Sequence, residues 1–196
     1  VMHELGILEQ FLTLPHQKVT QLAGQVGDFR TVFADFSHLP TRCKFVAFLP
    51  QWDFLNFLAE QGRRYPGFSL RTRAKAKRVI EEGGRIVGAV VDTDQGRIEV
   101  RSPLVVGADG RRSDIRASAG FAVKELGAPM DVLWFRLSRQ ASDPVETMGR
   151  FDAGRIFIMI NRGDNWQCGY VIPKGSRSRL QEAGLQAFRD GIVELA

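Results

Sequence analysis

The sequence predicts an α/β fold in which a layered α/β part is followed by the start of an antiparallel β-sheet. One observation is the almost wholly apolar run at residues 104–108, which breaks at Asp109-Gly110 and is typical of a buried strand in a layered sheet. The other is two series of strand-like runs separated by turn formers. They comprise residues 68–80, 85–93 and 97–100, and then residues 131–137, 147–151, 155–160 and 166–172.

The N-terminal part predicts two helices with strands and loops between them. Residues 1–13 are expected to form the end of a helix that Pro15 stops, because apolar residues recur there at helical spacing. Residues 18–46 scatter their apolar positions among Gly, Asp and Thr, which favours strands and loops. A second helix is expected over residues 51–62, with its apolar face formed by Leu55, Leu58, Ala59 and Gly62.

Residues 103–118 predict an interior strand, a tight turn and a helix. Residues 103–108 are expected to form the strand, with Asp109 at its carboxyl end, where open α/β sheets bind ligands. Gly110 permits a positive φ and the close approach of a ligand. Ser113 can cap the helix, and Arg116 lies over the same turn. The alternative for Asp109-Gly110 is an ordinary hairpin turn.

The C-terminal part predicts a sheet and a last helix. A boundary is expected at residues 127–129 (Gly-Ala-Pro), and residues 163–165 (Gly-Asp-Asn) form a hairpin turn in the sheet that follows. Ser178 and Gln181 form a capping box that opens a helical pattern running to the last residue. Since both ends fall within helical patterns, the chain is expected to be a piece of a longer protein.

The composition is that of a globular protein with a core. Of 196 residues, 44% are hydrophobic and 25% charged, and no apolar run approaches the roughly 20 residues needed to span a bilayer. Two cysteines without ligand spacing indicate a reduced compartment, with the cytoplasm as the expected location. The three histidines lie in different contexts, so no metal site is expected.

The pattern V-V-x-A-D-G-x-x-S-x-x-R at residues 105–116 resembles the Asp-Gly fingerprint of FAD-dependent aromatic-ring hydroxylases, the single-component flavoprotein monooxygenases typified by para-hydroxybenzoate hydroxylase. The resemblance implies FAD as cofactor and NAD(P)H as co-substrate. The enzyme would use O₂ to hydroxylate a small aromatic or related organic molecule. No catalytic side chain is predicted, because the cofactor carries the chemistry.

The resemblance also implies roles for five cofactor-binding residues. Asp109 would accept hydrogen bonds from the FAD ribose, and Gly110 would keep bulk away from the pyrophosphate. Arg116 would hold Asp109 or a neighbouring carbonyl, unless it is only a solvated helix residue. Gln51, if it is not simply a solvated first-turn glutamine, would open a helix beside the flavin. Ala74 is small where the strand would pass the adenosine.

Two of the three flavin motifs of this family are not found in the chain. No G-x-G-x-x-G follows a strand, and Gly163-Asp164 leads into a strand rather than the helix that the family's Gly-Asp motif needs. Residues 1–127 are therefore expected to be a partial FAD-binding domain and residues 128–196 a truncated substrate domain. Residues 166–173 faintly resemble a tryptophan motif of flavin-dependent halogenases, but its second tryptophan is absent, which favours an ordinary substrate-domain strand.

Three alternatives to the hydroxylase remain open. An FAD-dependent reductase or dehydrogenase would share the fold. A basic nucleic-acid-binding module is suggested by the net charge of +5 and by four cations at strand spacing, Arg71, Arg73, Lys75 and Lys77. No aromatic residue alternates with them to stack bases, so a solvated sheet face and no nucleic-acid partner are expected. The third alternative is an inactive fragment, whose unpaired strand edges would favour self-association into a homo-oligomer.

Overall fold

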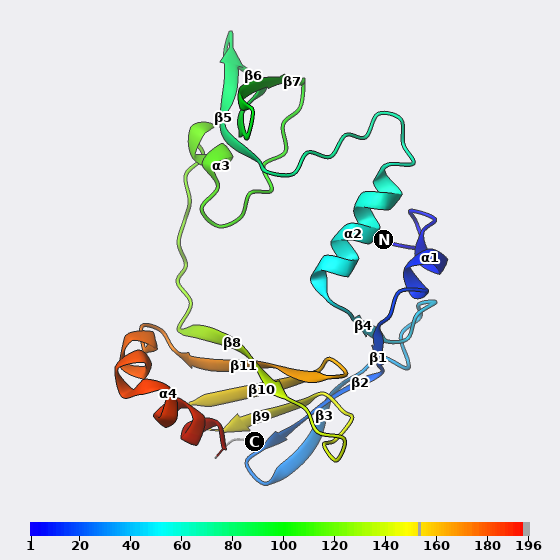
Figure 1. Ribbon diagram of the computed structural model, residues 1–196, viewed down its shortest axis with the longest axis vertical. Coiled ribbons are helices and arrows are strands. Elements are labelled where there is room, and N and C mark those ends of the chain that lie inside the picture. Colours follow the sequence, from blue (N-terminus) through cyan, green and yellow to red (C-terminus); the bar gives the residue numbers. More distant parts are fainter. Residues whose placement is uncertain (153, 194–196) are drawn as a thin grey trace. The chain divides into compact units, whose positions relative to one another are not determined.

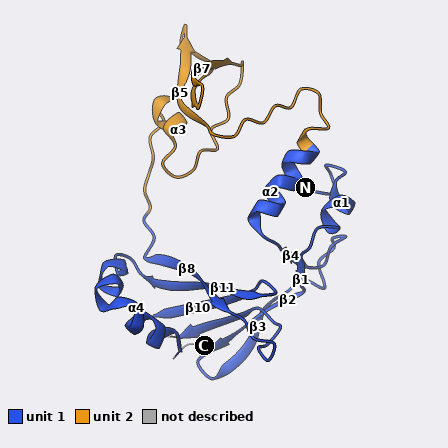
Figure 2. Cartoon of the chain, viewed as in Figure 1, with its two compact units in different colours: residues 1–61, 127–196 blue, residues 62–126 orange. Residues whose placement is uncertain are grey.

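The computed structural model describes residues 1–152 and 154–193, and the chain divides into two compact units. One unit comprises residues 1–61 together with the part from residue 127 onward, and the other comprises residues 62–126 (Figure 2). Helices and strands both occur in each unit (Figure 1), so the predicted mixed α/β class is confirmed.

The unit of residues 62–126 is built on a three-stranded antiparallel sheet. Its strands are β5 (Ala74–Glu82), β6 (Arg85–Thr93) and β7 (Gly96–Arg101), in that order. The short helix α3 (Asp114–Ser118) packs on β5, with Ile115 in a buried cluster with Val79 and Ala89. The two hairpins and a helix starting next to Ser113 agree with the sequence prediction, although β5 begins six residues later than expected.

Residues 103–108 correct the prediction of an interior strand. They have no regular secondary structure, and Leu104 and Val106 are 74% and 79% exposed. Only Val105 packs against the cluster around Ile115. An apolar run becomes a buried strand when a neighbouring strand pairs with it and layers cover both faces. No strand in the described residues pairs with this segment.

The other unit contains a six-stranded sheet with the order β3-β2-β9-β10-β11-β8. The strands are β2 (Gln21–Val26), β3 (Phe29–Asp35), β8 (Met130–Ser138), β9 (Met148–Asp152), β10 (Arg155–Asn161) and β11 (Asn165–Pro173). Neighbours are antiparallel except for β2 and β9, which pair in parallel. Residues 21–35 thus share a sheet with residues 130–173. The division into a flavin part up to residue 127 and a substrate part beyond it stays a prediction.

One face of this sheet is covered by α4 (Arg177–Val193), which begins one residue before the predicted capping box (Figure 1). Phe157, Trp166 and Cys168 are buried there with Ile192 of the helix. Phe188 of α4 packs edge-on against Phe135, with ring centroids 5.1 Å apart. Burial also raises the pKa of the Cys168 thiol to about 11, so this thiol stays protonated in the core.

Two helices and a small two-stranded sheet complete the unit. The strands β1 (Gln17–Val19) and β4 (Val46–Phe48) pair with each other. The helix α2 (Gln51–Gly62) has the predicted bounds, but the residue it buries is Phe57, against Phe11, whereas Leu55 of the predicted face is exposed. The helix α1 spans only Leu8–Leu12, because Gly6 turns the chain with φ +68°.

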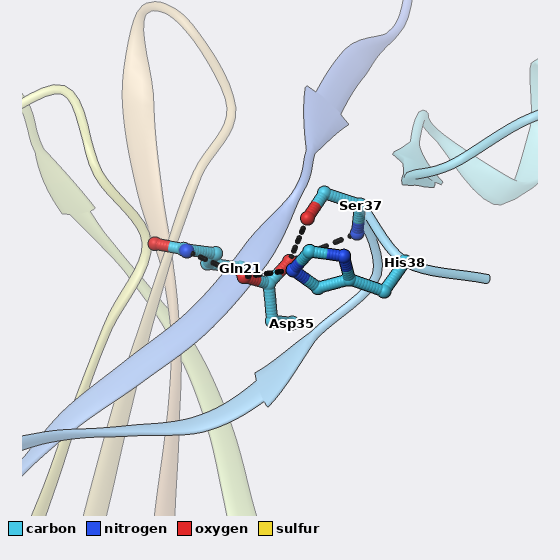
Figure 3. Close-up of polar contacts among 4 residues, drawn as sticks. All are labelled: Gln21, Asp35, Ser37 and His38. Carbon is cyan, nitrogen blue, oxygen red and sulfur yellow. Dashed lines mark hydrogen bonds and ion pairs between the residues drawn. The ribbon is translucent and has the colours of Figure 1, made fainter.

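A polar cluster fixes the end of the β2–β3 hairpin (Figure 3). Asp35 accepts hydrogen bonds from the backbone N–H of Ser37 at 2.9 Å, the Ser37 hydroxyl at 2.6 Å and Gln21 Nε2 at 2.9 Å. These bonds, with the Ser37 hydroxyl first, lower the pKa of Asp35 to about 2. The Asp35 carboxylate is therefore ionised at neutral pH. Its Oδ2 lies 3.9 Å from His38 Nε2.

No helix in residues 1–152 and 154–193 is long and apolar enough to cross a membrane. The same residues contain no cluster of three or more His, Cys, Asp or Glu side chains that could hold a metal ion.

Candidate functional site

A cleft of about 400 Å³ lies between the start of β5 and the irregular segment that leads to α3. Two predicted site residues, Ala74 and Asp109, line this cleft together. Its other lining residues are Lys75, Ala76, Val106, Gly107, Ala108, Arg112, Asp114 and Ile115. Half of these lining residues are glycine, alanine or valine, so a ligand can approach the backbone closely on this side.

Asp109 organises the loop that borders the cleft. Its carboxylate accepts hydrogen bonds from the Ser113 hydroxyl and from the backbone N–H of Ile115 at 3.1 Å. Ser113 in turn caps α3, because its Oγ accepts from the backbone N–H of Arg116 at 2.9 Å. The hydrogen bond from Ser113, followed by that from Ile115, lowers the pKa of Asp109, which is therefore ionised at neutral pH.

Gly110 and Arg116 line an adjoining cleft of about 230 Å³. Gly110 has φ +87°, which L-residues with side chains rarely adopt, so the predicted need for glycine here agrees with the backbone. Arg116 Nη2 donates to the carbonyl of Arg111 at 2.7 Å. Of the two predicted partners of Arg116, the structure therefore shows the neighbouring carbonyl and not Asp109.

The basic strand differs from its prediction. Arg71 and Arg73 precede β5, and Arg73 has φ +53°, so only Lys75 and Lys77 of the four cations lie on the strand. Arg73 forms an ion pair with Asp94 at 3.2 Å. Lys75 forms one with Asp114 at 3.0 Å, and this hydrogen bond raises the pKa of Lys75. Two of the four cations are thus neutralised by ion pairs with acidic side chains.

Gln51 is the first residue of α2 and is exposed. It belongs to the other compact unit, so its role beside a flavin stays a prediction. Lys75, Arg112 and Asp114 also line the cleft, although the family resemblance implies a cofactor-binding role for none of them. The sequence signal that could have pointed to Asp114 is an acidic residue in the first turn of a helix, directly after the capping Ser113.

The residues around the cleft suit the ribose and adenine end of a dinucleotide. The Asp109 carboxylate lines the cleft, and a carboxylate is an acceptor that can pair with hydroxyl donors such as those of a ribose. Lys75, which is paired with Asp114, and Arg112 also line the cleft, so both charge signs are present at its wall. Ala74 and Ala76 are half-buried, whereas Lys75 and Lys77 between and after them are exposed.

The fold is that of a flavin-binding protein. A family profile described as an FAD binding domain matches residues 1–189, and the chain belongs to this family. The 6-methylpretetramide 4-monooxygenase of Streptomyces rimosus is 31% identical over 159 residues, which are 81% of this chain and 38% of that protein. The chain therefore spans well under half the length of this curated relative.

Solved structures with the same fold include two halogenases and a monooxygenase. The flavin-dependent halogenase CmlS has a TM-score of 0.82 and 16% identity, over 100% of this chain and 37% of its own. The myxobacterial chondrochloren halogenase CndH has a TM-score of 0.81 and 15% identity, over 99% and 46%. PqsL of Pseudomonas aeruginosa, a probable FAD-dependent monooxygenase, has a TM-score of 0.72 and 15% identity, over 91% and 49%. At these identities the likeness shows the fold alone.

Proposed function

We propose that the chain is the central part of an FAD-dependent monooxygenase that uses NAD(P)H and O₂ to hydroxylate an aromatic or related organic substrate. The observation that carries the proposal is the 31% identity over 159 residues to a monooxygenase. FAD, when bound, supplies the redox chemistry, while the protein binds and orients the reactants. Since the chain spans 38% of that relative, other parts of the full-length protein complete the site.

In this proposal the cleft beside Asp109 holds the ribose and adenine of FAD. Asp109 accepts from a ribose hydroxyl, and its own position is fixed by Ser113 and the N–H of Ile115. Ala74 lets the backbone of β5 come close to the adenosine. Gly110 keeps the turn free of side-chain bulk near the pyrophosphate, and Arg116 holds that turn through the Arg111 carbonyl. Gln51 opens α2 near the flavin.

A halogenase is not the preferred function, although halogenases share the fold. Trp166, which lies in the tryptophan-containing segment, is only 2% exposed. Its Nε1 donates to Asp143 at 2.9 Å. The side chain is therefore a core residue of the sheet rather than part of a reaction site. A reductase or dehydrogenase of the same fold would lack oxygen transfer, which the following experiment measures directly.

The test uses the full-length protein purified with its flavin. We expect NADH or NADPH to reduce the bound flavin. The reduced protein is then exposed to ¹⁸O₂ with 1-hydroxy-2-naphthoate and with a panel of larger hydroxylated aromatics as candidate substrates. A monooxygenase places one ¹⁸O atom in the organic product, which mass spectrometry detects. Flavin reduction and reoxidation without oxygen incorporation into any panel member would favour the reductase or dehydrogenase instead.

A further inference from the structure

The face of the six-stranded sheet that carries α4 extends beyond this helix. The side chains that pack with Phe188 and Ile192 of α4 come from β8, β10 and β11. One of them, Phe157 on β10, also lines a pocket of about 110 Å³ together with residues of β9, β2 and β3. The pocket, here called the arginine pocket, therefore lies on the α4 side of the sheet, beside the strands that the helix covers.

Two arginines and a glutamine stand in one row in the arginine pocket. Arg30 is opposite Gln25 in the strand ladders, Gln25 is opposite Arg150, and Arg150 is opposite Phe157. Residues that are opposite each other in a ladder project from the same face of the sheet, so the whole row lies on the α4 side. The two arginines are separated by two strand spacings, about 10 Å, with the glutamine amide between them.

The two arginines are held in different ways. Arg150 Nε donates to Asp152 Oδ2 at 3.0 Å, and the Arg150 side chain is 33% exposed. This bond uses one of the five N–H groups of the guanidinium and fixes its position. Arg30 is exposed and forms no ion pair with another described residue. Since Asp152 offsets one of the two positive charges, the row keeps a net positive charge, which favours an anionic ligand.

A phosphate monoester suits the arginine pocket better than a carboxylate does. A single arginine can pair with both oxygens of a carboxylate in the bidentate geometry. A phosphate monoester has three terminal oxygens and a charge of about −1.5 to −2 at neutral pH, so it can accept from both guanidinium groups and from the Gln25 amide. Met148, Met159 and Phe157 also line the pocket. Their apolar surface excludes water and so strengthens charged hydrogen bonds.

A larger cleft of about 520 Å³ adjoins the arginine pocket and shares Arg30 and Thr147 with it. Gln17, Gln21 and Glu146 are among its polar lining residues. The Nε2 groups of the two glutamines donate to other side chains, at 3.1 Å and 2.9 Å. The cleft therefore offers amide and carboxylate oxygens, which accept hydrogen bonds from hydroxyl groups.

We propose that the arginine pocket and the adjoining cleft bind a small polyhydroxylated phosphate monoester of the sugar phosphate class. The phosphate lies between Arg30 and Arg150, and hydroxyl groups of the sugar donate to Glu146 and to the glutamine oxygens. The inference goes beyond the proposed function, because it uses none of the residues assigned to FAD. All residues of this site belong to the unit that contains the six-stranded sheet.

The test is calorimetric titration of the full-length flavoprotein with glucose 6-phosphate, inorganic phosphate and glucose. We expect glucose 6-phosphate to bind about tenfold more tightly than inorganic phosphate, and glucose to give no measurable heat. Arg30→Gln and Arg150→Gln should each weaken both phosphate probes about tenfold or more, because each removes charge-assisted hydrogen bonds. Glu146→Gln should reduce the preference for glucose 6-phosphate over inorganic phosphate.

The matched control is Arg136→Gln. Arg136 is an exposed arginine of β8 in the same sheet, and it alternates with Phe135 and Leu137, which pack beneath α4, so it lies on the opposite face. This variant should change neither affinity. An equal loss in the control would show an effect of net charge alone and would overturn the inference. No heat from glucose 6-phosphate, equal affinity for it and inorganic phosphate, or binding that survives Arg30→Gln and Arg150→Gln would overturn it as well.

Discussion

Asp109 combines a structural and a proposed binding role in one carboxylate. Its two oxygens accept from Ser113 and from the first turn of α3, and Asp109 also lines a cleft with many small residues. A substitution that removes the carboxylate therefore removes both the proposed ribose acceptor and a local support. Ser113→Ala helps to separate these roles, because it removes the support of Asp109 and the cap of α3 but keeps the carboxylate.

Asp109→Ala in the full-length protein should lower the FAD content after purification. A hydrogen bond to a charged group is worth about 1.5–3 kcal/mol, which corresponds to roughly tenfold to a hundredfold weaker binding. Gly110→Val should lower it at least as much, because the φ of +87° strains any larger residue and the side chain would fill space near the pyrophosphate. Flavin absorbance relative to protein measures both.

The controls are Ser113→Ala, which removes the hydroxyl that supports Asp109, and Asp94→Ala, which removes an exposed carboxylate elsewhere in the same unit. Both should retain more flavin than Asp109→Ala. Full flavin occupancy in Asp109→Ala and Gly110→Val together would show that the ribose does not lie here.

At the residue scale the sequence predicted what local spacing determines. The cap by Ser113 and the left-handed conformation of Gly110 follow from the residues next to them. Trp134 on β8, which is 58% exposed, had no such signal, because its environment is created by residues on other strands. The sequence left two acceptors possible for Arg116, the Asp109 carboxylate and a neighbouring backbone carbonyl, since spacing along a helix does not decide between them.

At the element scale, alternation and turn residues located most strands of the three-stranded and six-stranded sheets within a few residues. The prediction of a strand at residues 103–108 was wrong, because an apolar composition indicates only a preference for burial. A strand also needs a partner for its backbone hydrogen bonds. The helix predicted over residues 1–13 is too long. It spans only Leu8–Leu12, since Gly6 interrupts an otherwise helical pattern. Local patterns thus predict elements well only where pairing and chain reversal are also local.

The β6–β7 hairpin offers a test of close packing within an element. A Cβ at Gly88 would overlap the backbone carbonyl oxygen of Val100 on the paired strand, and a backbone group cannot turn aside as a side chain can. Gly88→Ala should therefore lower the free energy of unfolding by about 1–3 kcal/mol. Urea unfolding of the full-length protein, followed by circular dichroism, measures the change.

Gly67→Ala is the matched control, because a Cβ there meets nothing within 4 Å and the backbone has no positive φ. Its unfolding midpoint should stay close to that of the wild type. A Gly88→Ala protein as stable as the control would mean that β6 and β7 are further apart than described here.

At the scale of the whole molecule, the grouping of strands could not be predicted from the sequence. Residues 21–35 join β9 through a parallel pairing, Gln25 with Arg150 and Val26 with Phe151, over more than 120 residues of chain. Periodicity identifies a strand but carries no information on a partner that is distant in sequence. The family fingerprint, by contrast, identified FAD from a single loop, because a motif is read without knowledge of the remaining fold.

The last prediction is that this 196-residue chain alone neither retains FAD nor oxidises NAD(P)H. It spans 38% of its monooxygenase relative and contains no G-x-G-x-x-G after a strand, so a phosphate-binding glycine turn of that type is missing. Leu104 and Val106 are exposed next to the cleft, on a segment without a strand partner in the described residues. Purified alone, the chain should be colourless and should tend to self-associate through such surface. FAD titration followed by flavin fluorescence, with the full-length protein as positive control, measures binding. Stoichiometric quenching by the isolated chain would show that these residues suffice for the cofactor site and that the cleft beside Asp109 needs no further segment.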